Sequence, residues 1–162
     1  MTLPVELRPG DVCLYRRKGL FGWIISIVSN STIVHVEIYD GHGYSVASRD
    51  RIGVNRYPFR RSELAYVLRP NRLFNHPRAT RWFLAEEGAP YGWMDLLNFA
   101  LPSVTLDTAG FFCSEFAIEY LRHGDIELGN REPAVKISPR DFRLFDVLDE
   151  VWPEDTRPPE AV

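Results

Sequence analysis

The sequence predicts an α+β fold in which a small antiparallel sheet packs against helices. Strand-like segments fill the first 70 residues, whereas helical patterns dominate from residue 77 onward. Strands followed by helices are typical of α+β folds rather than of alternating parallel units. The 162 residues fit one domain, and 45% hydrophobic residues supply enough apolar surface for a packed core. We therefore expect one domain over residues 1–152 and a flexible, acidic, proline-rich tail over residues 153–162.

Five short segments in the first half of the chain carry strand signals. The sequence Arg8-Pro9-Gly10-Asp11 is typical of a turn, and an apolar segment follows it directly. The glycine-rich turn at residues 40–43 lies between two β-branched or aromatic segments, which predicts a hairpin. The expected strands are residues 12–15, 33–39, 44–48, 54–57 and 65–68.

Helical spacing and capping residues mark four further segments and the start of a fifth. Pro77 is suited to the first position of a helix, and Gly88 to the position after its end. Another helix is expected to stop at Gly124, and Ser138 with Asp141 three residues later resembles a helix start. The expected helices are residues 19–28, 77–87, 92–101 and 112–122.

Composition excludes several classes of protein. Two cysteines, Cys13 and Cys113, are too few for a disulfide scaffold or a structural zinc site. The four histidines show no metal-ligand spacing, and the phosphate-loop and dinucleotide-binding fingerprints are missing. A formal net charge of -3 gives no support to nucleic-acid binding. We expect no cofactor and no metal.

The chain carries no recognisable targeting segment. Charged residues interrupt the N-terminus before an apolar signal core could form, namely Glu6, Arg8 and Asp11. The apolar patch at residues 23–28 is far shorter than the roughly 20 residues that cross a bilayer. The expectation is therefore a cytoplasmic protein in the producing cell, although delivery by a phage particle or as an exported effector would leave no mark in the sequence.

Charge is distributed unevenly along the chain. The window from Arg49 to Arg81 holds nine arginines, and the stretch from Asp141 to the end holds seven acids. One interpretation is that these two regions pair across the surface of one domain. The alternative is that the arginine-rich middle binds an anionic polymer or a lipid headgroup.

Cys113 is the first candidate for chemistry because it lies at the predicted start of a helix. The positive end of the helix dipole and the free backbone amides there favour the thiolate, which is the nucleophilic form. The same amides could hold an oxyanion during acyl transfer. The alternative is a structural cysteine packed beside Phe111 and Phe112.

His35 is the matching candidate base. It lies within an apolar strand-like segment, where a histidine needs a hydrogen-bond partner or a chemical role. A cysteine at a helix start that faces a histidine on a strand forms a nucleophile and general-base pair. A structural histidine is the alternative when His35 is considered alone.

Four segments together resemble the circularly permuted, papain-like branch of the NlpC-type peptidases, which includes YiiX-like proteins and relatives of lecithin:retinol acyltransferase. In chain order they are Arg8-Pro9-Gly10-Asp11, His35-Val36-Glu37-Ile38-Tyr39, Gly88-Ala89-Pro90-Tyr91-Gly92-Trp93, and Phe112-Cys113-Ser114-Glu115-Phe116 with Ile137-Ser138-Pro139-Arg140-Asp141 downstream. The resemblance spans residues 8–145 and implies a permuted papain-like fold. It also implies that Cys113 is the nucleophile and His35 the general base.

The sequence departs from that family at two positions. The family usually has a polar residue twelve positions after the histidine, where it orients the imidazole, but Ala47 occupies that position here. Ser48 is adjacent, although a shift by one residue moves a strand side chain to the other face. Glu37, two residues after His35 on the same face, replaces a residue that is commonly small. Glu37 and Ser48 are therefore the candidate orienting residues.

Three functions follow as hypotheses. The first is a cysteine amidase or peptidase that acts through an acyl-enzyme, with peptidoglycan peptides as the substrate that the resemblance favours. The second is a lipid acyltransferase, phospholipase or thioesterase of the same fold, in which an apolar cluster meets a membrane or acyl chain. The third is a binding module that has lost catalysis, as Ala47 suggests. The apolar cluster is Leu20, Phe21, Trp23, Ile24 and Ile25.

Overall fold

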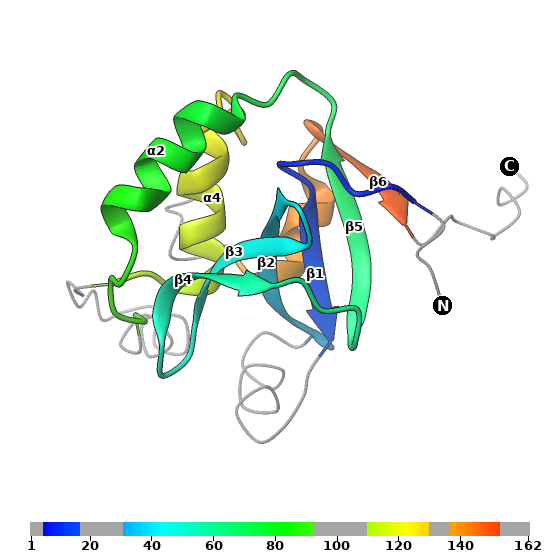
Figure 1. Cartoon of the computed structure of the whole chain (residues 1–162). Coiled ribbons are helices and arrows are strands. Elements are labelled where there is room, and N and C mark those ends of the chain that lie inside the picture. Colours follow the sequence, from blue (N-terminus) through cyan, green and yellow to red (C-terminus); the bar gives the residue numbers. More distant parts are fainter. Residues whose placement is uncertain (1–4, 17–30, 93–109, 130–136, 153–162) are drawn as a thin grey trace, which may run out of the picture.

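The domain is built on a six-stranded antiparallel sheet with strand order β4-β3-β2-β1-β5-β6 (Figure 1). The computed structural model describes residues 5–16, 31–92, 110–129 and 137–152. The α+β class and the antiparallel sheet are confirmed. The strands are β1 (Val12–Arg16), β2 (Ile33–Gly41), β3 (Tyr44–Arg49), β4 (Gly53–Pro58), β5 (Leu64–Pro70) and β6 (Leu148–Trp152).

Two helices, α2 (His76–Glu86) and α4 (Cys113–His123), pack against each other and against the sheet. Figure 1 shows them side by side on one face, with α4 lying next to β2 and β3. A 3-10 helix, η2 (Pro139–Leu144), packs near β2 and β6. The sheet therefore has one face covered by helices and a second face that carries its own, smaller cluster.

Strand alternation separates the two faces of the sheet. Val12 and Leu14 of β1 belong to the main core together with α4, whereas Cys13 and Tyr15 belong to the smaller cluster on the opposite face. Side chains on a strand point alternately to opposite faces, so β2 divides in the same way. Tyr15 is the register partner of His35 in β2, which puts His35 on the face of the smaller cluster.

The five strands expected from the sequence are all present, within two residues at each end. The sixth strand, β6, was not predicted, because the adjacent charges of Asp149 and Glu150 interrupt the apolar pattern of its segment. β6 is an edge strand that pairs only with β5 in the described sheet, and charged side chains are common on such edges.

The helix boundaries follow the capping residues. α2 begins with Pro77 in its first turn and with the side chain of Asn75 accepting a bond from the Arg78 amide, and α4 ends at Gly124. Asp141 accepts bonds from the backbone amide and the hydroxyl of Ser138, at 2.8 and 2.6 Å, so the predicted cap is present. The segment after it is a 3-10 helix rather than an α-helix. The expected helices at residues 19–28 and 92–101, and the tail at 153–162, lie outside the described residues, apart from Gly92.

A close backbone approach connects β4 to the segment that leads into α4. Gly53 has φ +85°, and a Cβ atom added to it would lie 2.1 Å from the carbonyl oxygen of Ala89. The amide of Val54 donates to that same oxygen at 2.9 Å. Next along the chain, Tyr91 forms a parallel bridge with Phe111. The start of α4 is thereby held in place by the edge of the sheet.

None of the described helices is long and apolar enough to cross a membrane.

Replacing Gly53 by alanine tests this close approach. We expect Gly53→Ala to lower the free energy of unfolding by about 3 kcal/mol or more, because it adds a backbone clash to the cost of a positive φ. Gly43→Ala is the matched control, since Gly43 also has a positive φ of +81° but has nothing within 4 Å of the added Cβ. That control should cost only about 1 kcal/mol in urea denaturation. Equal losses for the two variants would contradict the account.

Candidate active site

Cys113 is the first residue of α4, as the sequence predicts, and is held there by contacts of the two residues before it. The hydroxyl of Ser48 on β3 donates to the carbonyl of Phe111 at 2.6 Å. The ring of Phe112 packs against Tyr91 with centroids 5.7 Å apart. Extended backbone at Phe112 then turns directly into the helix. The sheet edge and these aromatic contacts thus fix the position of the thiol.

The thiol of Cys113 is completely buried, and burial raises its pKa to about 12. The backbone amides of Val36, Ser114 and Cys113 itself act in the opposite direction, while the negative charge of Glu37 adds to the rise. The expectation that the helix start would favour the thiolate is therefore wrong for this structure. The backbone amides lower the pKa of the thiol, but the loss of solvent raises it by more.

His35 is paired with Glu37, its neighbour two residues along the same face of β2. The Nε2 atom of His35 lies 3.0 Å from the Oε1 atom of Glu37. Glu37 has no exposed surface, whereas 16% of the His35 side chain is exposed. Glu37 is therefore positioned to orient His35, which is one of the two roles considered from the sequence.

Glu37 is surrounded by hydrogen-bond donors. Arg49 approaches Oε1 with its Nε and Nη2 atoms, at 3.0 and 2.7 Å. The hydroxyl of Ser45 donates to Oε2 at 2.5 Å, and Nη2 of Arg60 lies 3.4 Å from Oε1. Burial alone would raise the pKa of Glu37, but His35, Arg49 and Ser45 together lower it to about 2. The buried carboxylate is thus ionised at neutral pH.

An ionised Glu37 determines which nitrogen of His35 carries the proton. A carboxylate without a proton can only accept hydrogen bonds, so Nε2 must be the donor in the contact. In the neutral imidazole, Nδ1 then holds the lone pair and is available as a base. No described residue hydrogen-bonds to Nδ1.

The structure brings Cys113 next to β2 without joining it to His35. The thiol is directed at the amide of Val36, the neighbour of His35 in the chain. Within the described residues, no hydrogen bond joins the thiol to the imidazole. Val36 lies in the main core with Cys113, while His35 points to the other face beside Tyr15. Proton transfer between the two groups requires them to approach further.

Ser48, the other candidate orienting residue, does not contact His35, because its hydroxyl donates to Phe111 instead. Ala47 is buried on β3. The pairing of Ile38 with Val46 places position 47 opposite Glu37 in the antiparallel register. The small side chain of Ala47 therefore lies beside the carboxylate of Glu37.

Sequence reasoning missed the residues that hold Glu37. Ser45 and Arg49 lie two residues before and two residues after Ala47, on the same face of β3. That spacing, together with the position of Glu37 in an apolar strand, was a usable signal, because a buried glutamate must have cationic or hydroxyl partners nearby. Arg60 gave no such signal, since it lies in the loop between β4 and β5.

The arginines of the basic middle mostly form ion pairs within the domain. The acids that pair with them lie just before β1, in β2 and just after α4 rather than in the acidic C-terminal stretch. The pairs in the described residues are Arg49 and Arg60 with Glu37, Arg56 with Asp40, Arg69 with Asp11, and Arg78 with Asp125. The first interpretation, pairing with the C-terminal acids, is therefore wrong for these five arginines.

Within the described residues, no group of side chains is arranged to hold a metal ion. The apolar cluster at residues 20–25 lies outside the described residues. Cys13 is buried in the smaller cluster on the opposite face, and burial raises its pKa well above the ordinary value.

Comparison with protein-family models finds no match to this chain, and comparison with curated proteins finds none either.

The lowered pKa of Glu37 predicts how acid weakens the fold. A carboxylate whose pKa falls from 4.5 to about 2 on folding stabilises the protein above pH 4.5. That contribution, about 3 kcal/mol, is lost as the pH falls from 4.5 to 2. The difference in free energy of unfolding between wild type and Glu37→Gln, measured in urea, should shrink over this interval.

Glu119→Gln is the control for that measurement. Glu119 forms an exposed pair with Arg122, and such pairs contribute at most about 1 kcal/mol. The carboxyl carbon shift of Glu37 in the wild-type protein should report the same midpoint, near pH 2. A midpoint at or above the ordinary value of 4.5 would contradict an ionised, hydrogen-bonded Glu37.

Proposed function

We propose that the protein is a cysteine hydrolase of the amidase or peptidase type, with Cys113 as nucleophile, His35 as general base and Glu37 as orienting residue. The observation that carries the proposal is the 3.0 Å contact between His35 and the buried, ionised Glu37. This contact supports a fixed tautomer with Nδ1 as the basic nitrogen. A histidine whose orientation and tautomer are held by a carboxylate is suited to act as a general base.

The proposed reaction begins with acyl transfer to sulfur. Nδ1 of His35 takes the thiol proton as Sγ of Cys113 attacks the carbonyl carbon of the substrate. The backbone amides of Cys113 and Ser114, which are directed at the sulfur, stabilise the oxyanion. The imidazolium then protonates the leaving amine, and the C–N bond breaks to leave a thioester. Water, deprotonated by His35, hydrolyses the thioester and restores the thiol.

The pKa of Cys113 decides how the first step proceeds. A thiol with a pKa of about 12 is protonated at neutral pH, so transfer of the proton accompanies the attack instead of preceding it. Because the thiol is buried, the site must also open before a substrate can reach it. Binding of the substrate would supply the energy for that opening.

The resemblance to permuted papain-like peptidases fits this proposal. In those peptidases the orienting residue occupies the position that Ala47 has on β3 here. In this protein we propose that Glu37, on the neighbouring strand β2, takes over that role. Glu37 approaches His35 from within β2, and the small Ala47 leaves room for it. The proposed fold is accordingly the permuted papain-like one, and the proposed substrates are amides of peptides, including those of peptidoglycan.

A second candidate function is a binding module without turnover. The observations that favour it are the complete burial of Cys113 and the missing hydrogen bond to His35 among the described residues. In that case Cys113 is a core residue, and the cluster around Glu37 only stabilises the sheet.

Acylation with an activated ester separates these two functions. We expect p-nitrophenyl acetate to acetylate Cys113 in the wild-type protein, as located by peptide mass spectrometry, and His35→Ala to slow the reaction. Glu37→Gln should slow acylation at least about 10-fold, because the imidazole loses its orienting charge. Cys13→Ala is the control and should leave the rate unchanged, since Cys13 lies in the smaller cluster on the opposite face.

A double variant makes the test specific for position. Glu37→Gly combined with Ala47→Glu puts the carboxylate on β3, opposite its present position. We expect this variant to recover part of the rate that Glu37→Gln loses. Equal, slow acetylation of Cys13 and Cys113, unaffected by His35→Ala, would reject the hydrolase and favour the binding module.

A further inference from the structure

Arg49 on β3 contacts the oxygen of Glu37 that faces His35. Its Nε and Nη2 atoms lie 3.0 and 2.7 Å from Oε1, and Nε2 of His35 lies 3.0 Å from the same atom. The other oxygen, Oε2, accepts from the hydroxyl of Ser45, which is also on β3. Each carboxylate oxygen therefore has a donor on β3, and together these donors fix the plane of the carboxylate.

Arg49 is itself held in place by the neighbouring strand. Its guanidinium carbon lies 3.8 Å from the centre of the Tyr57 ring, over the face of the ring. Tyr57 is buried on β4, and its hydroxyl donates to the carbonyl of Gly53 at 2.8 Å. The ring is thus fixed, and it restricts the guanidinium that stacks on it.

Arg60, the other arginine near Glu37, makes a weaker contact. Only its Nη2 atom approaches Oε1, and the distance of 3.4 Å is long for a hydrogen bond. The side chain of Arg60 is also more exposed than that of Arg49, by 35% against 22%. Of the two arginines, Arg49 has the geometry that can hold the carboxylate in one orientation.

We propose that Arg49 is a positioning residue for the reaction, which acts on His35 through Glu37. By holding Oε1 in place, Arg49 keeps the acceptor in line with the Nε2 proton of His35 and leaves Nδ1 as the basic nitrogen. This role requires no contact between Arg49 and the thiol or the substrate. The effect on catalysis rests on the proposed hydrolase, whereas the effect on the hydrogen bond of His35 does not.

Exchange of the His35 Nε2 proton with water measures that hydrogen bond directly. We expect Arg49→Gln to speed the exchange at least about 10-fold in proton NMR, because the carboxylate is no longer held toward the ring. Arg49→Lys keeps the charge beside Glu37 but lacks the two-nitrogen fork, so it should recover only part of the protection. The spectra are recorded at a pH at which the carboxyl carbon shift shows Glu37 to be ionised in every variant, so that a difference reports the orientation of the carboxylate and not its charge.

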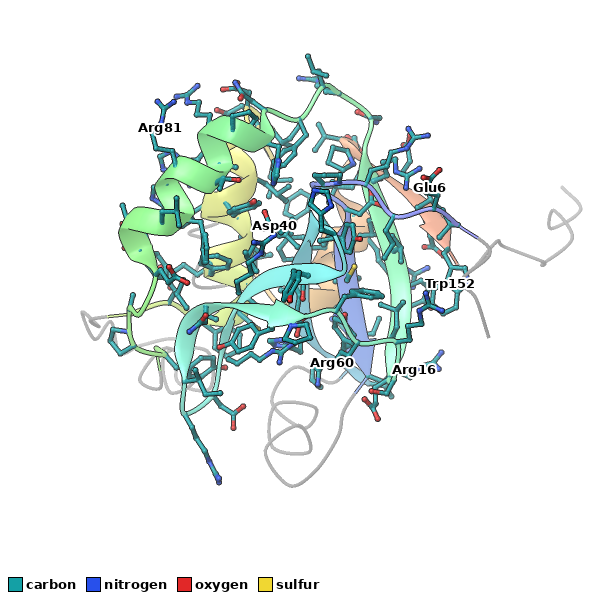
Figure 2. The ribbon with its side chains drawn as sticks, in the orientation of Figure 1. Glu6, Arg16, Asp40, Arg60, Arg81 and Trp152 are labelled. Carbon is teal, nitrogen blue, oxygen red and sulfur yellow. The ribbon has the colours of Figure 1, made fainter. Side chains whose placement is uncertain are left out.

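Arg56→Gln is the matched control. Arg56 also pairs with a buried carboxylate that contacts a histidine: its Nε lies 2.8 Å from Oδ2 of Asp40, whose Oδ1 lies 2.8 Å from Nε2 of His76. Figure 2 shows Asp40 on the side of α4 and apart from Arg60. This variant loses a comparable ion pair on the other face of β2, so it should leave the exchange at His35 unchanged.

A double variant tests whether Arg49 acts through Glu37. Arg49→Gln alone should slow acetylation of Cys113 by p-nitrophenyl acetate about 10-fold, but it should cause no further loss when Glu37→Gln is already present. Additive losses, unchanged proton exchange in Arg49→Gln, or full recovery by Arg49→Lys would overturn the positioning role. Faster exchange in Arg49→Gln, in a protein whose Cys113 is not acetylated at all, would overturn the hydrolase and support the effect of Arg49 on His35.

Discussion

The buried carboxylate of Glu37 is the group on which the arrangement of this face of the sheet depends. A charge without solvent is tolerated only when donors surround it. Here β2 supplies one donor residue, β3 supplies two and the loop before β5 supplies one. Removing the carboxylate would leave the guanidinium groups of Arg49 and Arg60 facing each other across a partly buried space. The contacts of the carboxylate with these groups are the reason to expect a single conformation around His35.

The same carboxylate connects the fold to the chemistry that we propose. Because Glu37 is ionised, His35 donates from Nε2 and keeps Nδ1 free to accept a proton. Cys113 approaches from the other face, brought to the strand by the backbone contacts of Gly53 and Phe111. The burial of the thiol suppresses its ionisation, and in the proposed reaction the thiol stays protonated until a substrate opens the site.

Much of the fold could be predicted from local patterns, and less of the site could. Turn residues and alternation gave the first five strands, and capping residues gave the ends of α2 and α4. The sixth strand could not be predicted from its own residues, because Asp149 and Glu150 are unusual in a strand except at the edge of a sheet. Its edge position depends on pairing with β5, which the segment alone does not reveal. For Cys113, the sequence revealed the helix start but not the depth of burial, which reverses the expected direction of its pKa. The contact between Glu37 and His35 could be predicted, because residues two apart on a strand lie on the same face. The contact of Arg60 with Glu37 could not, because Arg60 lies in a loop whose position depends on the whole fold.

The most direct test of this account is the protonation state of the His35 ring, read from its nitrogen chemical shifts in a long-range nitrogen–proton correlation spectrum. For the neutral ring, the account predicts a proton on Nε2 and a lone pair on Nδ1, with the preference lost in Glu37→Gln. A ring that carries its neutral proton on Nδ1, or one whose tautomer is the same with and without the carboxylate, would contradict the central role of Glu37.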